Sequence, residues 1–388
     1  MPETHDITAA AVADLLGAMV ATPSINPDLL APGLPAEWAG EERMARFVRD
    51  WLVASGIEAA FEEVLPGRPN VVARLPGPPG APRVIWEGHT DTVQVDGMDD
   101  PFTPVVRDGR LYGRGAVDDK ASLAMFMLAL RAARDLDRDC DVTFVAAIDE
   151  ETTFRGVTHH AAAHPPYAMG IAGEPTGLRI ITALKGATRF VVEVHGRNAH
   201  SSRPHEGIDA IALAADLHAH LREAMKRDTR RHPMLGPSTL TCTRIAGGEG
   251  LNSVPARVRM TFDLRTLPEE TGTEAWTRVA GLVASFPLPD GARIETKPPF
   301  IDGLSMEVPR DAAIVGRLGA ALARAGRDPE PIGAPFGSDA STLTRRGTPT
   351  VVFGPGDIAQ AHAIDEYADL EDVATAARLL VATIVTEP

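Results

Sequence analysis

Histidine and acidic residues stand just past the ends of apolar runs in the first half of the chain, and one more histidine follows such a run near its end. They are His89, Asp91, Asp118, Glu150, Glu151, Glu174 and His362. Open α/β sheets bind ligands at the carboxyl ends of their strands, so these side chains are predicted to converge. Among them, two imidazoles and three carboxylates form a ligand set suited to Zn²⁺, Co²⁺ or Mn²⁺. Because no cysteine is among them, the set favours a catalytic metal site over a structural one.

The number of candidate ligands indicates two ions. Five protein ligands are too many for one tetrahedral catalytic ion with an open position, but they suit two ions bridged by one carboxylate. Such ions, roughly 3.5 to 4 Å apart, share a hydroxide and polarise a carbonyl oxygen, which is the chemistry of amide hydrolysis. Glu150, next to Glu151, would carry the proton from water to the leaving amine, and Asp91 would fix the tautomer of His89. Taken singly, each motif also fits an ordinary loop or strand end.

The elements that position these residues follow from hydrophobic periodicity. Apolar runs at 82–88, 141–148 and 167–172 predict buried strands, and 121–134 predicts a helix between them. This alternation is typical of an α/β fold with a mixed, mostly parallel sheet flanked by helices.

From about residue 184 the pattern changes to β-α-β-β-α-β, which predicts an inserted ferredoxin-like α+β domain. Its segments are 188–195, 207–225, 238–245, 256–264, 269–286 and 292–296. The α/β pattern then resumes, so we expect a catalytic domain in two parts, 1–183 and 297–388, around an insertion at 184–296. A length of 388 residues agrees with two domains or one domain with a large insertion.

Composition narrows the class of protein. Hydrophobic residues at 44% and charged residues at 23% are typical of a globular chain. A net charge of −15 disfavours binding to nucleic acid or anionic lipid. No apolar run approaches the roughly 20 residues of a membrane span, and the first residues lack the positive charge of a secretory signal. With only Cys140 and Cys242, a cytoplasmic protein is predicted.

Five motifs occur together in a fixed order. They are HTD at 89–91, GRGAVDDK at 113–120, DEE at 149–151, GEPT at 173–176 and QAHAIDEY around His362. In these the chain resembles the di-zinc amidohydrolase and metallopeptidase family that includes acetylornithine deacetylase, succinyl-diaminopimelate desuccinylase, aminoacylase and carboxypeptidase G. The resemblance implies a zinc-exopeptidase-like domain, a lid domain and a homodimer formed through that lid. It also implies that Asp118 bridges two Zn²⁺ ions, with His89 and Glu174 on one, Glu151 and His362 on the other, and Glu150 as the base.

Further segments resemble the family's substrate-contacting parts. The segment around His200 resembles the lid loop whose histidine reaches across the dimer to stabilise an oxyanion, although a histidine there also fits a surface loop. Asn252 lies in a segment similar to the substrate-contacting loop. Arg265 stands where relatives have a carboxylate-binding arginine, or it is a solvated charge. Gly337 and Ser338 resemble a loop near the metals.

The resemblance implies hydrolysis of the amide bond of an N-acyl amino acid. HSSRPHEGIDAI and GPGDIAQAHAIDEY look most like acetylornithine deacetylase, whereas Ala340 and Ser341 disfavour a desuccinylase. A dipeptidase or glutamate-type carboxypeptidase on the same two metals is the alternative, and Glu174 speaks against the aminopeptidase branch. A catalytically inactive relative is disfavoured because every ligand and Glu150 are present.

Overall fold

The computed structural model describes residues 6–95 and 97–386, which form two compact units. Unit 1 contains the chain up to Thr182, Val308–Ile332 and the chain from Ser338 onward. Unit 2 contains Ala183–Glu307 and Gly333–Gly337. The chain therefore leaves unit 1 and returns to it, so residues far apart in sequence share one unit.

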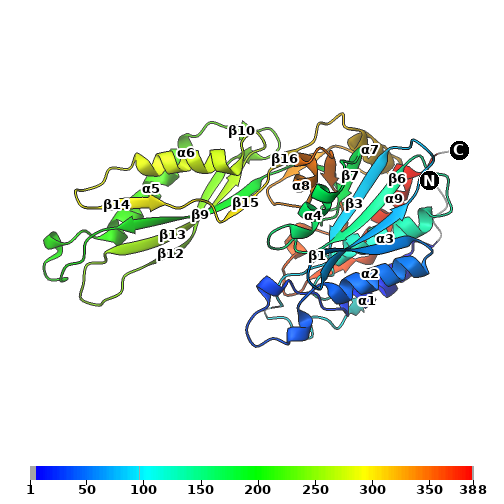
Figure 1. Cartoon of the computed structure of the whole chain (residues 1–388), viewed down its shortest axis with the longest axis horizontal. Helices are drawn as coiled ribbons and strands as arrows, with labels where there is room; N and C mark the ends of the chain where they lie inside the picture. Colours follow the sequence, from blue (N-terminus) through cyan, green and yellow to red (C-terminus); the bar gives the residue numbers. More distant parts are fainter. Residues whose placement is uncertain (1–5, 96, 387–388) are drawn as a thin grey trace. The chain divides into compact units, whose positions relative to one another are not determined.

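A mixed nine-stranded sheet with helices on its faces has most of its strands in unit 1 (Figure 1). Its path is β1 (Glu58–Leu65), β2 (Arg68–Leu75), β6 (Asp141–Ala147), β3 (Arg83–His89), β7 (Met169–Ala172), β18 (Thr350–Val352), β8 (Ile181–Leu184) and β16 (Met306–Glu307), and β17 (Ile332–Ala334) pairs with β8. The predicted mixed sheet flanked by helices is confirmed. Parallel pairing joins β6 to β3, β3 to β7 and β7 to β18. The hairpin β1–β2 adds an antiparallel edge, because a short turn cannot join parallel strands.

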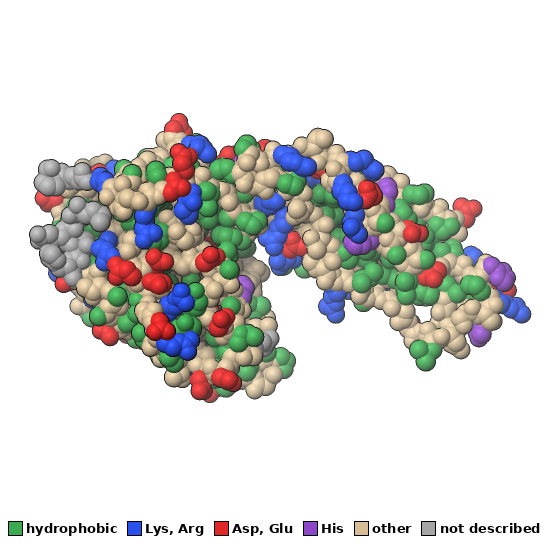
Figure 2. Space-filling model, turned by 180° about the vertical axis from the view of Figure 1, so that it is seen from behind, with side chains coloured by type: hydrophobic (Ala, Val, Ile, Leu, Met, Phe, Trp, Pro, Cys, Tyr) green, Lys and Arg blue, Asp and Glu red, His purple; other side chains and the backbone are tan. Residues whose placement is uncertain are grey.

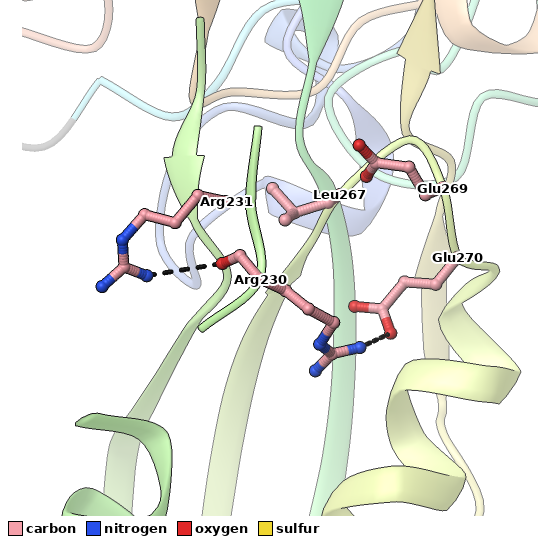
Figure 3. A pocket seen from close by; sticks show the side chains of 5 residues that line it. All are labelled: Arg230, Arg231, Leu267, Glu269 and Glu270. Atoms are coloured by element: carbon pink, nitrogen blue, oxygen red, sulfur yellow. Dashed lines mark hydrogen bonds and ion pairs between the residues drawn. The ribbon is translucent and has the colours of Figure 1, made fainter. Parts of the chain in front are cut away.

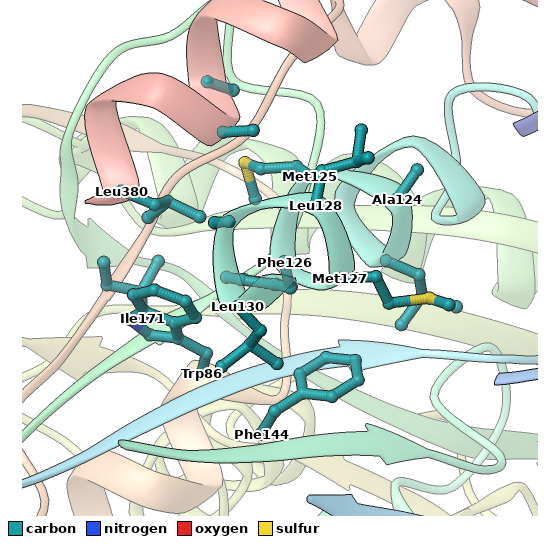
Figure 4. Close-up of a cluster of buried hydrophobic side chains, with 14 of the residues drawn as sticks. Trp86, Ala124, Met125, Phe126, Met127, Leu128, Leu130, Phe144, Ile171 and Leu380 are labelled. Atoms are coloured by element: carbon teal, nitrogen blue, oxygen red, sulfur yellow. The ribbon is translucent and has the colours of Figure 1, made fainter. Parts of the chain in front are cut away.

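Helix α3 (Lys120–Ala133) is buried along nearly its whole length. It lies between the sheet, which contributes Trp86, Phe144 and Ile171, and helix α9 (Leu370–Ile384), which contributes Leu380 (Figure 4). A helix that is apolar all round needs such cover on both sides. The ring of Phe126 is 5.8 Å from that of Trp86. Asp118 stands just before this helix, so the core fixes its place.

The remaining elements of unit 1 are shorter. The helices are α1 (Ala9–Val20), α2 (Glu42–Ala54), α4 (Arg155–Ala163), α7 (Ala313–Arg324) and α8 (Ala340–Arg345). A small antiparallel sheet has the order β19 (Tyr367–Asp369), β5 (Arg110–Tyr112), β4 (Val105–Arg107). It joins the segment before Asp118 to the segment after His362.

Unit 2 has the strand order β12-β13-β9-β14, with β15 also paired to β9, and all of these pairings are antiparallel. The elements are β9 (Gly186–His195), α5 (Ala210–Arg227), β10 (Arg231–His232), β11 (Gly236–Pro237), β12 (Thr239–Gly247), β13 (Arg257–Thr266), α6 (Gly272–Ala284), β14 (Arg293–Thr296) and β15 (Ile301–Gly303). The order β9-α5-β12-β13-α6-β14 is a split βαβ topology. The unit extends to Glu307, beyond the expected end at residue 296, because β15 pairs with β9.

Acidic and basic side chains are interspersed over unit 1 on the face shown in Figure 2. Within residues 6–95 and 97–386, no helix combines the length and the apolar character needed to span a membrane.

Candidate active site

Two groups of possible metal ligands share Asp118. One consists of His89, Asp118 and Glu174, and the other of Asp118, Glu151 and His362; in each group the ligand atoms lie within 4.8 Å of one another. Oδ1 of Asp118 is 3.0 Å from Nε2 of His89, and Oδ2 is 3.3 Å from Nε2 of His362. The two oxygens of one carboxylate thus face two different imidazoles. This donor set fits two divalent ions with Asp118 between them.

His89 ends strand β3 and is held from both sides of its ring. Nδ1 lies 3.0 Å from the carbonyl oxygen of Asp91, so Nε2 points toward Asp118. The backbone N–H of His89 donates to Oδ2 of Asp119, at 3.1 Å. Burial opposes a charge on this ring, but hydrogen bonds with Asp118 and Asp91 outweigh it and raise the pKa of His89 well above its usual value.

Glu174 follows β7 at the same edge of the sheet. Its neighbour Gly173 lies so close to α3 that a Cβ there would be 2.5 Å from the Cβ of Ser122. Only glycine therefore lets the end of this strand approach the helix. Glu174 is buried, and burial together with the nearby charges of Glu150 and Asp118 raises its pKa well above the usual value.

Asp91 organises the loop that carries both glutamates. Its carboxylate accepts the backbone N–H of Glu150 at 3.1 Å and that of Glu151 at 3.2 Å. Nδ2 of Asn26 donates to the same carboxylate at 2.8 Å. The carboxylate is 3.5 Å from Nδ1 of His89, farther than the Asp91 carbonyl oxygen. Asp91 therefore contacts both the imidazole and the loop of the candidate base.

Negative charge is in excess throughout this site. Burial raises the pKa of Glu150 well above its usual value, and repulsion by Asp339 and Glu151 adds to it. His362 is the most exposed member of the site. Hydrogen bonds with Asp118 and Glu151 raise the pKa of His362 to about 10. Metal-free protein can relieve this repulsion only by holding protons, whereas divalent cations would neutralise it directly.

Glu366 is a positioning residue that the sequence analysis missed. Its buried carboxylate accepts a hydrogen bond from Arg114 at 2.5 Å and from the backbone N–H groups of Gly115, Val117 and Asp118 at 3.0, 3.0 and 3.2 Å. It thus fixes the loop that presents Asp118. The only sequence signal was the acidic pair of Asp365 and Glu366 in the run AIDEY, close after His362.

A cavity of about 510 Å³ opens beside His362 within unit 1. Aliphatic side chains dominate its lining, with a few polar groups. The lining residues are Asp28, Leu29, Leu30, Ala31, Pro32, Val93, Gln94, Arg114 and His362. This cavity is large enough for an amino acid side chain or an acyl group next to a candidate ligand.

Unit 2 has a hollow of its own, lined by Arg230, Arg231, Leu267, Glu269 and Glu270 (Figure 3). Arg230 pairs with Glu270 at 2.9 Å, and its other contacts include Asp228 at 2.5 Å. The charges of Arg230 and Glu270 are therefore paired within the unit. The hollow contains none of the site residues that the motifs predicted.

His200 and Asn252 lie on two loops of unit 2 that bind each other. The backbone N–H of Ser201 donates to the carbonyl oxygen of Asn252 at 2.9 Å, and both His200 and Asn252 are exposed. The ring of His200 contacts Oγ of Ser202 through Nδ1, at 2.7 Å, which leaves Nε2 facing outward from this contact.

The other predicted substrate-binding residues are separated. Arg265 pairs with Asp263 at 2.8 Å and lies opposite Ala187, at the far end of β9 from the loop of His200. Gly337 belongs to unit 2, and Ser338 begins the return to unit 1, where it is buried. Within unit 2, Arg265 and His200 are therefore not brought together.

Comparison with known proteins gives concordant matches. Residues 85–386 match the family described as Peptidase family M20/M25/M40. Acetylornithine deacetylase of Photorhabdus laumondii is 32% identical over 398 residues, which cover 95% of this chain and 94% of the relative. A tripeptidase from Staphylococcus aureus has a similar fold, with a TM-score of 0.79, 19% identity, and coverage of 97% of this chain and 98% of that one. The YXEP protein of Bacillus subtilis, described as a dinuclear metal binding peptidase, has a TM-score of 0.67 at 17% identity, with 97% of each chain covered.

Proposed function

Since the chain belongs to peptidase family M20/M25/M40, as its motifs predicted, we propose that it hydrolyses the amide bond of N-acyl amino acids with two bound metal ions. The observation that carries the proposal is the position of Asp118 between two ligand groups, each completed by a histidine and a glutamate. Zn²⁺ is the proposed ion, and Co²⁺ or Mn²⁺ would suit the same ligands.

Each ligand keeps the role that its position suggests. His89 and Glu174 would hold one ion, Glu151 and His362 the other, and Asp118 would bridge them. When bound, the ions would lower the pKa of a shared water and polarise the substrate carbonyl oxygen. A dinuclear site in the similarly folded Bacillus subtilis protein supports this number of ions.

Glu150 is the proposed general base. It would take a proton from the attacking water and deliver it to the leaving nitrogen. The raised pKa of Glu150 favours proton delivery to the leaving nitrogen, because a carboxylate that binds protons readily can hold one until the amine leaves. Asp91 would keep this glutamate in place through the backbone of residues 150 and 151.

We propose that His200, on an exposed loop, donates a hydrogen bond to the oxyanion of the neighbouring subunit in a dimer formed through unit 2, which would act as a lid. Asn252, bonded to the same loop, would contact substrate. Arg265 would bind a substrate carboxylate, but only in competition with Asp263, which already pairs with its guanidinium. Gly337 and Ser338 are also proposed to contact substrate.

N-acetylornithine is the first substrate to test, because the relative that is 32% identical is named acetylornithine deacetylase. The alternative is a dipeptidase or glutamate-type carboxypeptidase, since the same ligands and base would also cleave a peptide bond. The cavity beside His362 would take a side chain in either case.

The deciding experiment measures amine release by metal-stripped protein, with and without added Zn²⁺ or Co²⁺. The panel contains N-acetyl, N-succinyl and N-formyl amino acids together with dipeptides. We expect metal-dependent turnover with N-acetyl amino acids to exceed that with dipeptides. A preference for dipeptides would reject the deacylase assignment in favour of the alternative, and no turnover on any member would reject both.

A further inference from the structure

Glu62, His160 and His164 form a second cluster of metal-ligand type in unit 1, and it shares no residue with the groups around Asp118. We propose that this cluster is an additional binding site for a divalent cation of the zinc class. The proposal goes beyond the hydrolytic site, because it concerns a metal that the reaction itself does not use.

The geometry of the cluster carries the inference. His160 and His164 are four residues apart, on α4 and at its carboxyl end, so both rings leave the same face of the helix. Nδ1 of His160 is 3.0 Å from Oε2 of Glu62, and Nε2 of His164 is 2.7 Å from Oε1. Glu62 comes from strand β1. Two imidazoles one helical turn apart, facing a carboxylate from another element, form a ligand arrangement typical of zinc.

An outer shell is already in place around these three side chains. Nε2 of His160, the ring nitrogen that faces away from Glu62, is 2.9 Å from the hydroxyl of Tyr167. Nδ2 of the buried Asn70 donates to Oε2 of Glu62 at 3.0 Å, and Asn70 is itself bonded to the backbone of Gly156. Such partners orient metal ligands and fix the tautomer of a ligating histidine.

Without a metal, two neutral imidazoles can each donate an N–H to the carboxylate of Glu62, with their ring centroids 4.3 Å apart. A divalent ion would replace these two protons and bind the same facing atoms of Glu62, His160 and His164. The hydrogen-bonded cluster is therefore the metal-free form of the proposed site, and a count of bound metal distinguishes the two.

Solvent can complete the coordination. The side chain of His160 is 1% exposed, that of Glu62 16% and that of His164 38%, so the site is open on the side of His164. Water can therefore supply the fourth ligand of a four-coordinate ion. An ion here would tie the end of α4 to β1, and α4 begins soon after the loop of Glu150 and Glu151.

The test counts bound metal in the full-length protein, free of any histidine tag, after dialysis against a fixed concentration of free Zn²⁺. The variants are His164→Ala, which removes the most exposed ligand, and His159→Ala, a matched control on an exposed position of the same helix. We expect His164→Ala to bind one zinc ion fewer than both the wild type and His159→Ala, with unchanged amidase turnover. Equal zinc content in all three proteins would overturn the proposal.

A second set of variants distinguishes metal bound at this cluster from metal bound at the proposed hydrolytic site. In a His89→Ala background the proposed catalytic pair is disrupted, and adding His164→Ala should still lower the zinc content by one ion. If His164→Ala does not fold, Glu62→Gln replaces it, since it keeps the side-chain volume and removes the charge. Zinc content that His164→Ala and Glu62→Gln both leave unchanged would show that the cluster is a hydrogen-bonded group and not a metal site.

Discussion

Replacing Glu366 by Gln tests whether this residue positions Asp118, the proposed metal bridge. Oε2 accepts from Arg114 and Gly115, and Oε1 accepts from Val117 and Asp118. A glutamine has one oxygen and one NH₂ group. Whichever way its amide lies, the NH₂ group faces two N–H donors, so one pair loses its acceptor.

The expected loss follows from burial. Arg114 is 2% exposed and Glu366 is 1% exposed, so the guanidinium would be left without its carboxylate out of reach of bulk water. Breaking a buried pair in this way costs about 3 to 5 kcal/mol. At about 2 to 4 °C for each kcal/mol, the lower estimate lowers the Tm by roughly 6 to 12 °C. Because either orientation of the amide disturbs the loop that presents Asp118, affinity for Zn²⁺ should also fall by about 10- to 100-fold.

The assay is thermal unfolding of metal-free protein together with zinc titration. Glu371→Gln is the matched control, because it makes the same change of charge in a surface pair with Arg378, where the glutamate side chain is 63% exposed. Surface pairs contribute at most about 1 kcal/mol. If Glu366→Gln melts together with Glu371→Gln and binds zinc as the wild type does, the positioning role is wrong.

Three further predictions address the catalytic groups and the second cluster. Glu150→Gln should keep its metal content by elemental analysis but lose about 10²- to 10⁴-fold in amine release, and unchanged turnover would exclude it as the base. His200→Ala should lower kcat without changing metal content, and full activity would remove its oxyanion role. Burial opposes ionisation of Glu62, but hydrogen bonds with His160 and His164 lower its pKa to about 2 in metal-free protein. Its contribution to the free energy of unfolding should therefore be complete above about pH 4.5 and be lost as the pH falls toward 2, so urea titrations should show Glu62→Gln converging on the wild type in acid.

The central part of the fold was predictable because its strands are buried on both faces. Continuous apolar runs marked β3, β6 and β7, and parallel strands between two helical layers have this pattern. The hairpin of β1 and β2 was missed, since β1 has no fully buried residue and charged residues interrupt both strands. Its turn at Pro66 and Gly67 was a usable signal.

For the site, the order of motifs named the candidate ligands, but only the three-dimensional structure shows which atoms meet. Asp118 faces both His89 and His362. This arrangement depends on the packing of α3 and on the path of the C-terminal segment that carries His362. Glu366 could not be identified from the sequence, because nothing in it distinguishes this residue from the other acidic residues, 53 in all, or indicates its hydrogen-bond partners. The contact of Glu62 with His160 joins segments about a hundred residues apart, which local periodicity cannot reveal.

The charge of the candidate metal site links stability to the proposed function. Five carboxylates, those of Asp91, Asp118, Glu150, Glu151 and Glu174, stand around two imidazoles, and the pKa of Glu150 and that of Glu174 are raised by burial and mutual repulsion. Metal-free protein folds against this repulsion. Two divalent cations would add four positive charges, so the folded state should bind them strongly and be stabilised in proportion to RT ln(1 + [L]/Kd). The arrangement that disfavours the metal-free fold is therefore the same one that prepares the site for its ions.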